Sequence, residues 1–188
     1  MTLERTIGRL LRPIRAGDRH LAWSDRRLRD IPATILLSSP GFAEAAPMPQ
    51  RYAGTGVGEN ISPPLAWSNI PAGTLTLVLI MQDPDAPLPR PVTHLVAAIP
   101  AERDGVGEGM LAFGKDPTIE LGRGSFRRIG YAGPRPPQGH GPHRYIFQIF
   151  ALAGRLSGPT VPDLGSAIAG IAKSALARGR LTGTFERP

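Results

Sequence analysis

The chain has 188 residues, a length that suits one domain with a single sizeable hydrophobic core. It contains no cysteine, which excludes disulfides, thiolate catalysis and cysteine metal sites. The formal net charge is +7 and is carried almost entirely by arginine. Such a field attracts phosphates, anionic lipid or nucleic acid, but charge alone does not choose among them.

No apolar run in the sequence reaches the length that a membrane-spanning helix needs. The N-terminus also lacks the unbroken apolar core of a signal peptide, because arginines interrupt it. A cytoplasmic protein is therefore expected. Glycine and proline are abundant and spread along the whole chain, which predicts many ordered turns rather than a disordered tail.

The first thirty residues form a basic extension that we expect to be separate from a domain at residues 31–188. Apolar residues from Leu3 to Ile14 follow helical spacing, and Pro13 limits how far such a helix can run. Two interpretations stay open. The extension is either a loosely attached structural piece or a segment that lies on a membrane surface or covers a partner.

The next part of the chain is dominated by short apolar runs between glycine- and proline-rich turns. Such runs predict strands, and they lie at residues 34–37, 75–81, 94–99 and 145–152. Residues 47–64 and 101–142 are predicted to be loops. A loop as long as the second one is usually functional in a compact domain.

The C-terminal part changes to helical spacing. A helix is predicted from Leu164 to Ala175, with Asp163 as its N-cap and Gly179 as its stop, followed by a short final strand at 181–185. Short strands joined by turns, with few helices, predict a mostly β fold. The expected architecture is an antiparallel β-sandwich with a few peripheral helices.

The densest polar chemistry lies in the turn that contains Asp83, Pro84, Asp85 and Pro87, directly after a predicted buried strand. The two carboxylates allow three roles. They can accept hydrogen bonds from turn amides, orient a nearby histidine, or act as an acid/base pair. The prolines fix the backbone of this turn before any ligand arrives.

Two histidines are the other candidates. His94 begins a strand, and His143 follows a glycine-rich turn and precedes Arg144 and Tyr145. Strand alternation sends His143 and Tyr145 to one face and Arg144 to the other, so Arg144 is expected to pack or form an ion pair. Histidines and carboxylates also match zinc or iron ligands, but no HExxH helix is present. No metal and no cofactor are expected.

A series of motifs in a fixed order carries a family resemblance. They are Ser62-Pro63-Pro64-Leu65-x-Trp67, Pro71-x-Gly73-Thr74, Asp83-Pro84-Asp85-Ala86-Pro87, His94, Gly130-Tyr131-x-Gly133-Pro134-x-Pro136-Pro137, and Gly141-Pro142-His143-Arg144-Tyr145-x-Phe147. From about Ile31 to its C-terminus the chain resembles the phosphatidylethanolamine-binding protein family, specifically its bacterial Raf-kinase-inhibitor-like branch. Each motif is weak alone, whereas the ordered set is specific.

The resemblance implies a β-sandwich with a small pocket for phosphate-like anions. In it Asp83 would hold and polarise His94, the prolines would shape the wall, and a turn would close the cavity. The implied ligand-binding set is Asp83, Pro84, Asp85, Pro87, His94, Gly133, Pro134, Arg135, His143 and Tyr145. The resemblance also implies a phospholipid headgroup or phosphorylated ligand, a kinase or protease as partner, and a homodimer.

The sequence therefore predicts a non-enzymatic binding protein for phosphate-bearing ligands that regulates a kinase or protease. Two alternatives stay open. One is an acid/base hydrolase that uses Asp83, His94 and His143, and the other is an arginine-driven nucleic-acid or membrane-surface binder. Under the leading interpretation we expect neither a nucleic-acid partner nor insertion into a membrane.

Overall fold

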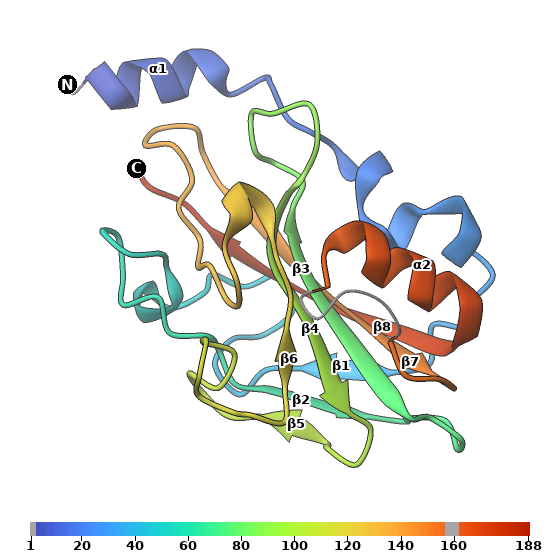
Figure 1. Ribbon diagram of the computed structural model, residues 1–188. Helices are drawn as coiled ribbons and strands as arrows, with labels where there is room; N and C mark the ends of the chain where they lie inside the picture. The colour runs from blue at the N-terminus through green and yellow to red at the C-terminus, as the bar shows by residue number, and fades with distance from the viewer. Residues whose placement is uncertain (1–2, 157–161) are drawn as a thin grey trace.

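The computed structural model describes residues 3–156 and 162–188, which form two antiparallel sheets (Figure 1). The larger sheet has the strand order β6-β4-β3-β7-β8, with β3 at Thr76–Asp83, β4 at Val92–Pro100, β6 at Glu120–Leu121, β7 at His143–Leu152 and β8 at Ala175–Phe185. The smaller sheet contains β1 (Leu36–Ser38), β2 (Leu65–Ser68) and β5 (Gly105–Val106). The predicted mostly β, antiparallel sandwich is confirmed.

The helices lie at the periphery of the two sheets (Figure 1). The α-helices are α1 (Leu3–Leu11) and α2 (Leu164–Ser174), and the short 3-10 helices are η1 (Asp18–His20), η2 (Ala22–Ser24), η3 (Arg26–Leu28), η4 (Gln50–Tyr52) and η5 (Ser125–Arg127). Asp163 caps α2 as predicted, because its side chain accepts from the Ser166 amide and the Ser166 hydroxyl accepts from the Asp163 amide.

Strand β3 forms the centre of the larger sheet, and all eight of its residues are buried. It pairs antiparallel with β4 on one side and β7 on the other. Both neighbours therefore begin where β3 ends. This topology brings Asp83, His94 and His143 to one end of the sheet, although they are far apart in the sequence.

Alternation along β3 builds a core on each face of the larger sheet. Leu77, Leu79 and Met81 belong to the core between the two sheets. Val78 and Ile80 face the other way and pack with α2 and with Ala22 and Leu28. These two residues belong to the first thirty residues, here called the N-terminal segment. The N-terminal segment therefore covers part of the second core, as α2 does.

The N-terminal segment is also held by buried polar groups of the sheet. The side-chain oxygen of Gln82 accepts from the Ala22 amide at 2.8 Å, and that of Gln148 accepts from the Trp23 amide at 2.7 Å. Arg178 lies over the Trp23 ring at 4.0 Å and donates to the Trp23 carbonyl. The division into an extension at 1–30 and a domain at 31–188 stays a prediction.

The prediction that Gly179 stops the C-terminal helix is wrong. Helix α2 ends at Ser174, and the chain passes directly into β8, which contains Gly179 in its interior. Gly179 is needed there for close approach, since a Cβ atom at this position would lie 2.3 Å from the Ile35 carbonyl oxygen. The final strand is therefore eleven residues long rather than the short piece expected.

Within the two described ranges, no helix combines the length and the apolar character needed to cross a bilayer. The cytoplasmic placement stays a prediction.

Candidate functional site

A hollow of about 390 Å³ opens at the end of the sheet where β3 stops and β4 and β7 begin. Four of the predicted side chains line it together: Asp83, His94, His143 and Tyr145. The walls come from three loops, at residues 86–88, 125–128 and 132–137. Antiparallel pairing thus brings together four side chains that the sequence spreads over 63 positions.

Asp83 uses its two carboxylate oxygens for two different tasks. Its Oδ1 accepts from the backbone amide of Asp85 at 2.8 Å, which closes the proline turn. Its Oδ2 lies 2.8 Å from Nδ1 of His143 and orients that ring. The expectation that Asp83 holds His94 is therefore wrong, because its hydrogen-bond partner across the sheet is His143.

His94 is instead held by the loop that follows η5. Its Nδ1 lies 2.6 Å from the Ala132 carbonyl oxygen. A carbonyl only accepts, so Nδ1 carries the proton. Nε2 has no hydrogen-bond partner in the part of the chain that the structure describes. Burial lowers the pKa of His94, while the Asp83 carboxylate opposes this effect. In the ligand-free protein, the His94 ring is therefore neutral at neutral pH.

Tyr145 carries an unused hydrogen-bonding group. Its side chain is fully buried, and its hydroxyl makes no hydrogen bond to any described residue. Burial and the Asp83 carboxylate raise the pKa of Tyr145, and the nearby Arg135 amide opposes them without reaching hydrogen-bond geometry. An unpaired buried hydroxyl is costly, so this group requires a partner supplied from the hollow. It remains protonated and can donate.

Asp85 and Arg144 lie outside the hollow. The Asp85 carboxylate accepts from the Arg144 amide at 2.8 Å and from the Arg144 Nε at 2.9 Å, and it pairs with Arg15 at 3.1 Å. The expectation that Arg144 forms an ion pair is confirmed. The structure does not bring Asp85 into contact with the hollow, although it was included among the predicted ligand groups.

The other predicted ligand-binding residues also divide into those that line the hollow and those that do not. Pro87, Gly133 and Arg135 line the hollow, whereas Pro84 and Pro134 do not. The carbonyls of these two prolines support the walls from behind. Pro84 accepts from the Gly17 amide, and Pro134 accepts from the Gly54 amide, both at 2.8 Å.

His140 is a site residue that the sequence reasoning did not single out. It is fully buried, and its Nδ1 lies 2.8 Å from Nε2 of His143. Its Nε2 lies 2.9 Å from the carbonyl oxygen of Leu11, in the N-terminal segment. A signal existed, since His140 stands three positions before His143 within the same glycine-rich turn.

The rim of the hollow combines positive charge with apolar surface. Arg128 and Arg135 are exposed there, and Arg128 is close enough to contribute to the lowered pKa of His94. Leu88 and Phe126 line the same hollow and are partly to largely exposed. The rim therefore favours a ligand with an anionic group and suits one that also has an apolar part.

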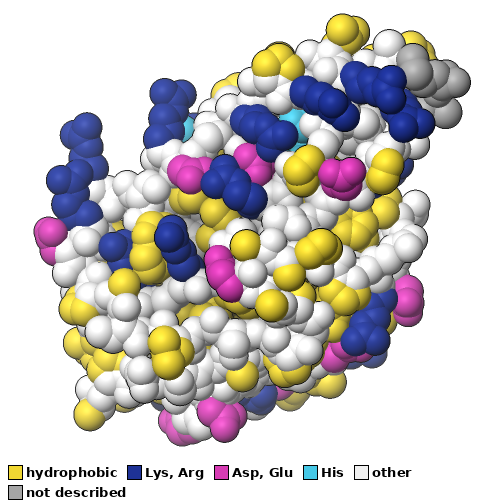
Figure 2. All heavy atoms as spheres, turned by 180° about the vertical axis from the view of Figure 1, so that it is seen from behind, with side chains coloured by type: hydrophobic (Ala, Val, Ile, Leu, Met, Phe, Trp, Pro, Cys, Tyr) yellow, Lys and Arg dark blue, Asp and Glu magenta, His cyan; other side chains and the backbone are white. Residues whose placement is uncertain are grey.

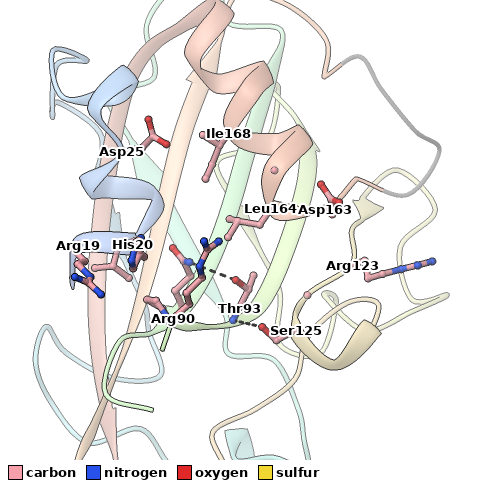
Figure 3. Close-up of a pocket in the computed structure, with 15 residues that line it drawn as sticks. Arg19, His20, Asp25, Arg90, Thr93, Arg123, Ser125, Asp163, Leu164 and Ile168 are labelled. Atoms are coloured by element: carbon pink, nitrogen blue, oxygen red, sulfur yellow. Dashed lines mark hydrogen bonds between the residues drawn. The ribbon is translucent and has the colours of Figure 1, made fainter. Parts of the chain in front are cut away.

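A larger hollow of about 540 Å³ adjoins this one. The two share Thr93 and Ser125, whose hydrogen bond of 2.9 Å lies between them (Figure 3). Arg90 extends into the larger hollow, while Arg19 and Arg123 extend away from it (Figure 3). Its buried polar side chains, Gln82 and Thr93, are already hydrogen-bonded, so it lacks the unpaired buried donor that marks the smaller hollow.

Metal ligands are not grouped in the described residues. Across 3–156 and 162–188, no three histidine or carboxylate side chains are arranged to hold a metal ion. The nearest approach to such a set, Asp83 with His143 and His140, is a chain of hydrogen bonds.

Comparisons with known proteins identify relatives of this chain by sequence. The chain is 39% identical over 121 residues to a UPF0098 protein of Aquifex aeolicus, covering 64% of this chain and 70% of that one. It is 36% identical over 152 residues to LppC of Mycobacterium tuberculosis, whose name classes it as a lipoprotein, covering 81% of this chain and 72% of that one.

Two solved structures share the fold. The PEBP homologue CT736 of Chlamydia trachomatis aligns with a TM-score of 0.73 at 29% identity, covering 82% of this chain and 98% of that one. The Escherichia coli protein YbcL aligns with a TM-score of 0.76 at 24% identity, covering 83% and 100%. The sequence model described as phosphatidylethanolamine-binding protein matches residues 38–186. This chain therefore belongs to the phosphatidylethanolamine-binding protein family.

Proposed function

We propose that this protein binds a small anion, and specifically a phosphate-bearing group, in the hollow lined by His94 and Tyr145. The observation that carries the proposal is the fully buried Tyr145 hydroxyl, which has no partner among the described residues. His94, whose Nε2 is free, lines the same hollow, and its ring contacts the Tyr145 ring edge to face with centroids 5.2 Å apart. A ligand oxygen between them would satisfy both groups.

Binding in this hollow is coupled to a proton. Neutral His94 donates from Nδ1 to Ala132, so its Nε2 presents a lone pair to the hollow. An anion oxygen needs a donor at that position. An unprotonated ligand oxygen therefore favours the uptake of a proton by His94, which gives the hollow the positive charge that such an oxygen prefers.

The geometry favours binding over hydrolysis. A general base needs a free nitrogen within reach of the proton it removes. Both ring nitrogens of His143 are engaged, one by Asp83 and one by His140. His143 is therefore not available as the base, and the free nitrogen of His94 lacks the hydrogen-bonded carboxylate that the predicted set of Asp83, His94 and His143 would have supplied. The kinase or protease partner and the homodimer stay predictions.

The first test is calorimetric titration with inorganic phosphate and with phosphoethanolamine. Removing the His94 ring in His94→Ala and the hydroxyl in Tyr145→Phe is expected to weaken binding roughly tenfold or more, the factor for a hydrogen bond to a charged group. His20→Ala serves as the matched control, because His20 lines the neighbouring hollow. Equal affinity in all four proteins, or no binding by the wild type at millimolar ligand, would defeat the proposal.

The second test is the pH dependence of that affinity. Because burial lowers the pKa of His94 in the free protein and a bound anion favours the protonated ring, affinity is expected to fall as pH rises through the histidine range. The slope reaches at most about tenfold per pH unit for one proton. Sulfate is used beside phosphate, since its charge stays constant there. A flat sulfate affinity from about pH 5.5 to 8 contradicts proton-coupled binding.

A further inference from the structure

Asp83 and His143 form what is here called the floor of the hollow. Three hydrogen bonds in series link this floor to the N-terminal segment. Asp83 Oδ2 meets His143 Nδ1 at 2.8 Å, His143 Nε2 meets His140 Nδ1 at 2.8 Å, and His140 Nε2 meets the Leu11 carbonyl oxygen at 2.9 Å. The rings of His140 and His143 are in edge contact, with centroids 4.8 Å apart. All of the side chains in this series are buried.

The series requires one proton more than two neutral imidazoles carry. The Leu11 carbonyl only accepts, so His140 Nε2 must donate to it. If His140 is neutral, its Nδ1 accepts, and His143 must donate from Nε2. His143 must then also donate from Nδ1 to the Asp83 carboxylate. Three hydrogen bonds therefore need three protons, of which two neutral rings supply two.

The hydrogen-bond geometry assigns the extra proton to the pair formed by His143 and Asp83, whose ring nitrogen Nδ1 and carboxylate oxygen Oδ2 lie 2.8 Å apart. Burial, the neighbouring His143 and Arg15 together lower the pKa of His140, which keeps that ring neutral. His143 lies directly against the Asp83 carboxylate, so an imidazolium there is compensated. The ionisable groups near the two rings come from several elements: Asp83 from β3, His94 from β4, Tyr145 from β7 and Arg15 from the N-terminal segment. Arg15 is itself paired with Asp85 of the proline turn.

The N-terminal segment is seated on the same turn by close contacts. Arg12 donates from Nε to the Gly139 carbonyl at 2.8 Å, and Arg15 donates to the Pro142 carbonyl at 3.1 Å. Gly8 is buried, and a Cβ atom there would lie 2.0 Å from the Gln138 carbonyl oxygen. Helix α1 can approach the turn this closely only because residue 8 lacks a side chain.

The opposite face of α1 is apolar and exposed. Leu3 is 77% exposed and Leu10 is 74% exposed. Seen from behind, apolar side chains lie along the outer edge above α1 and basic side chains lie below them (Figure 2). The contacts that seat α1 and the residues after it include the hydrogen bonds of Arg12 and Arg15 and an ion pair between Glu4 and Arg187. A segment held in this way can leave its seat without exposing a large buried core.

We propose that His140 is a positioning residue that couples the seating of residues 3–17 to anion binding in the hollow. This inference rests on the proposed function and adds its regulation. When the segment is seated, the Leu11 carbonyl fixes the His140 tautomer, and His143 holds its second proton against Asp83. The floor of the hollow then carries no net charge.

The unseated state has a different proton count. Without the Leu11 carbonyl, neutral His140 can donate from Nδ1 to His143, and neutral His143 can donate to Asp83. Two hydrogen bonds then need only two protons, and the floor carries the net negative charge of Asp83. An anion is repelled by that charge, so seating strengthens anion binding. By linkage, a bound anion strengthens seating to the same extent.

The test uses the full-length protein with Gly8→Leu, which pushes α1 off the turn without changing a group of the hollow, and with His140→Ala, which cuts the link. Leu10→Ala on the exposed face is the matched control. Hydrogen exchange of residues 3–17 reports seating, nitrogen NMR signals of His143 report its protonation, and calorimetry with inorganic phosphate reports binding.

We expect faster exchange in Gly8→Leu and a neutral His143 signal where the wild type shows an imidazolium. Phosphate affinity should fall about five- to tenfold, the lower part of the usual range for coupling between sites. His140→Ala should show the same loss of affinity, and the double variant should show no further loss, because both changes break one link. Leu10→Ala should behave as wild type.

Two outcomes overturn the coupling: an unseated segment with unchanged phosphate affinity and an unchanged His143 signal, or additive losses in the double variant. Failure of the proposed function looks different. If the wild type binds no phosphate while Gly8→Leu still changes the His143 signal, the link between segment and histidine stands and the ligand is wrong.

Discussion

Replacing Asp85 with alanine is expected to lower the free energy of unfolding by about 3 kcal/mol, because a buried carboxylate that accepts several charge-assisted hydrogen bonds is lost. The Asp85 side chain is 5% exposed and ties together three segments. It holds the backbone and guanidinium of Arg144 on β7 and the guanidinium of Arg15 in the N-terminal segment. Its loss loosens the proline turn from both.

Asp18→Ala is the matched control for this prediction. Asp18 pairs with the same Arg144 at 2.9 Å, but its side chain is 53% exposed. An exposed pair is screened by water and salt, so the expected loss is below about 1 kcal/mol. Urea unfolding of the two variants measures the difference. Equal losses would show that burial of Asp85 does not decide the strength of its interactions.

The same carboxylate predicts a pH dependence of stability. Burial alone would raise the pKa of Asp85, but hydrogen bonds from Arg144 and Arg15 outweigh burial and hold it below its usual value. A depressed carboxyl pKa stabilises the folded state above the unfolded pKa, and this contribution is lost as pH falls through the folded pKa. The difference between wild type and Asp85→Ala is therefore expected to shrink below about pH 4.

The sequence predicted the strands whose signal is local. β3, β4 and β7 are apolar runs between turns, and their positions followed from composition alone. Strand β8 was mostly missed because residues 175–180 contain alanine and arginine, which favour a helix. Its register against β7, with Ala177 opposite Ala151, is a long-range pairing that local propensity does not contain.

The site was predicted as a set of residues but not as a set of bonds. Alternation correctly separated His143 and Tyr145 from Arg144, since it depends only on a period of two. It carries no information on which ring a carboxylate reaches across the sheet, so Asp83 was given the wrong histidine. The position of His140 in the glycine-rich turn could have marked it as a candidate, but its contact with Leu11, 129 positions away, is one that no local pattern reveals.

Gly133→Ala is expected to destabilise the fold by about 3 kcal/mol and to deform the hollow, because the added methyl group has no room. A Cβ atom at this position would lie 2.2 Å from the Tyr52 carbonyl oxygen and 2.7 Å from the Ala53 carbonyl carbon, both of which are backbone atoms. The Gly133 amide also donates to the Asn60 side chain at 2.8 Å, so the turn cannot retreat without breaking that bond.

Gly107→Ala is the control variant, which separates the steric clash at Gly133 from the general cost of replacing a glycine. Its backbone lies outside the left-handed region, and its nearest contact to an added Cβ would be the Met110 side chain at 3.5 Å, an ordinary distance. Little change in thermal unfolding is expected for it. Gly133 lines the hollow and Gly107 does not. Only Gly133→Ala should therefore also weaken phosphate binding. A Gly133→Ala protein with wild-type stability and affinity would show that the turn is free to move, and the rigid wall assumed for anion binding would then be absent.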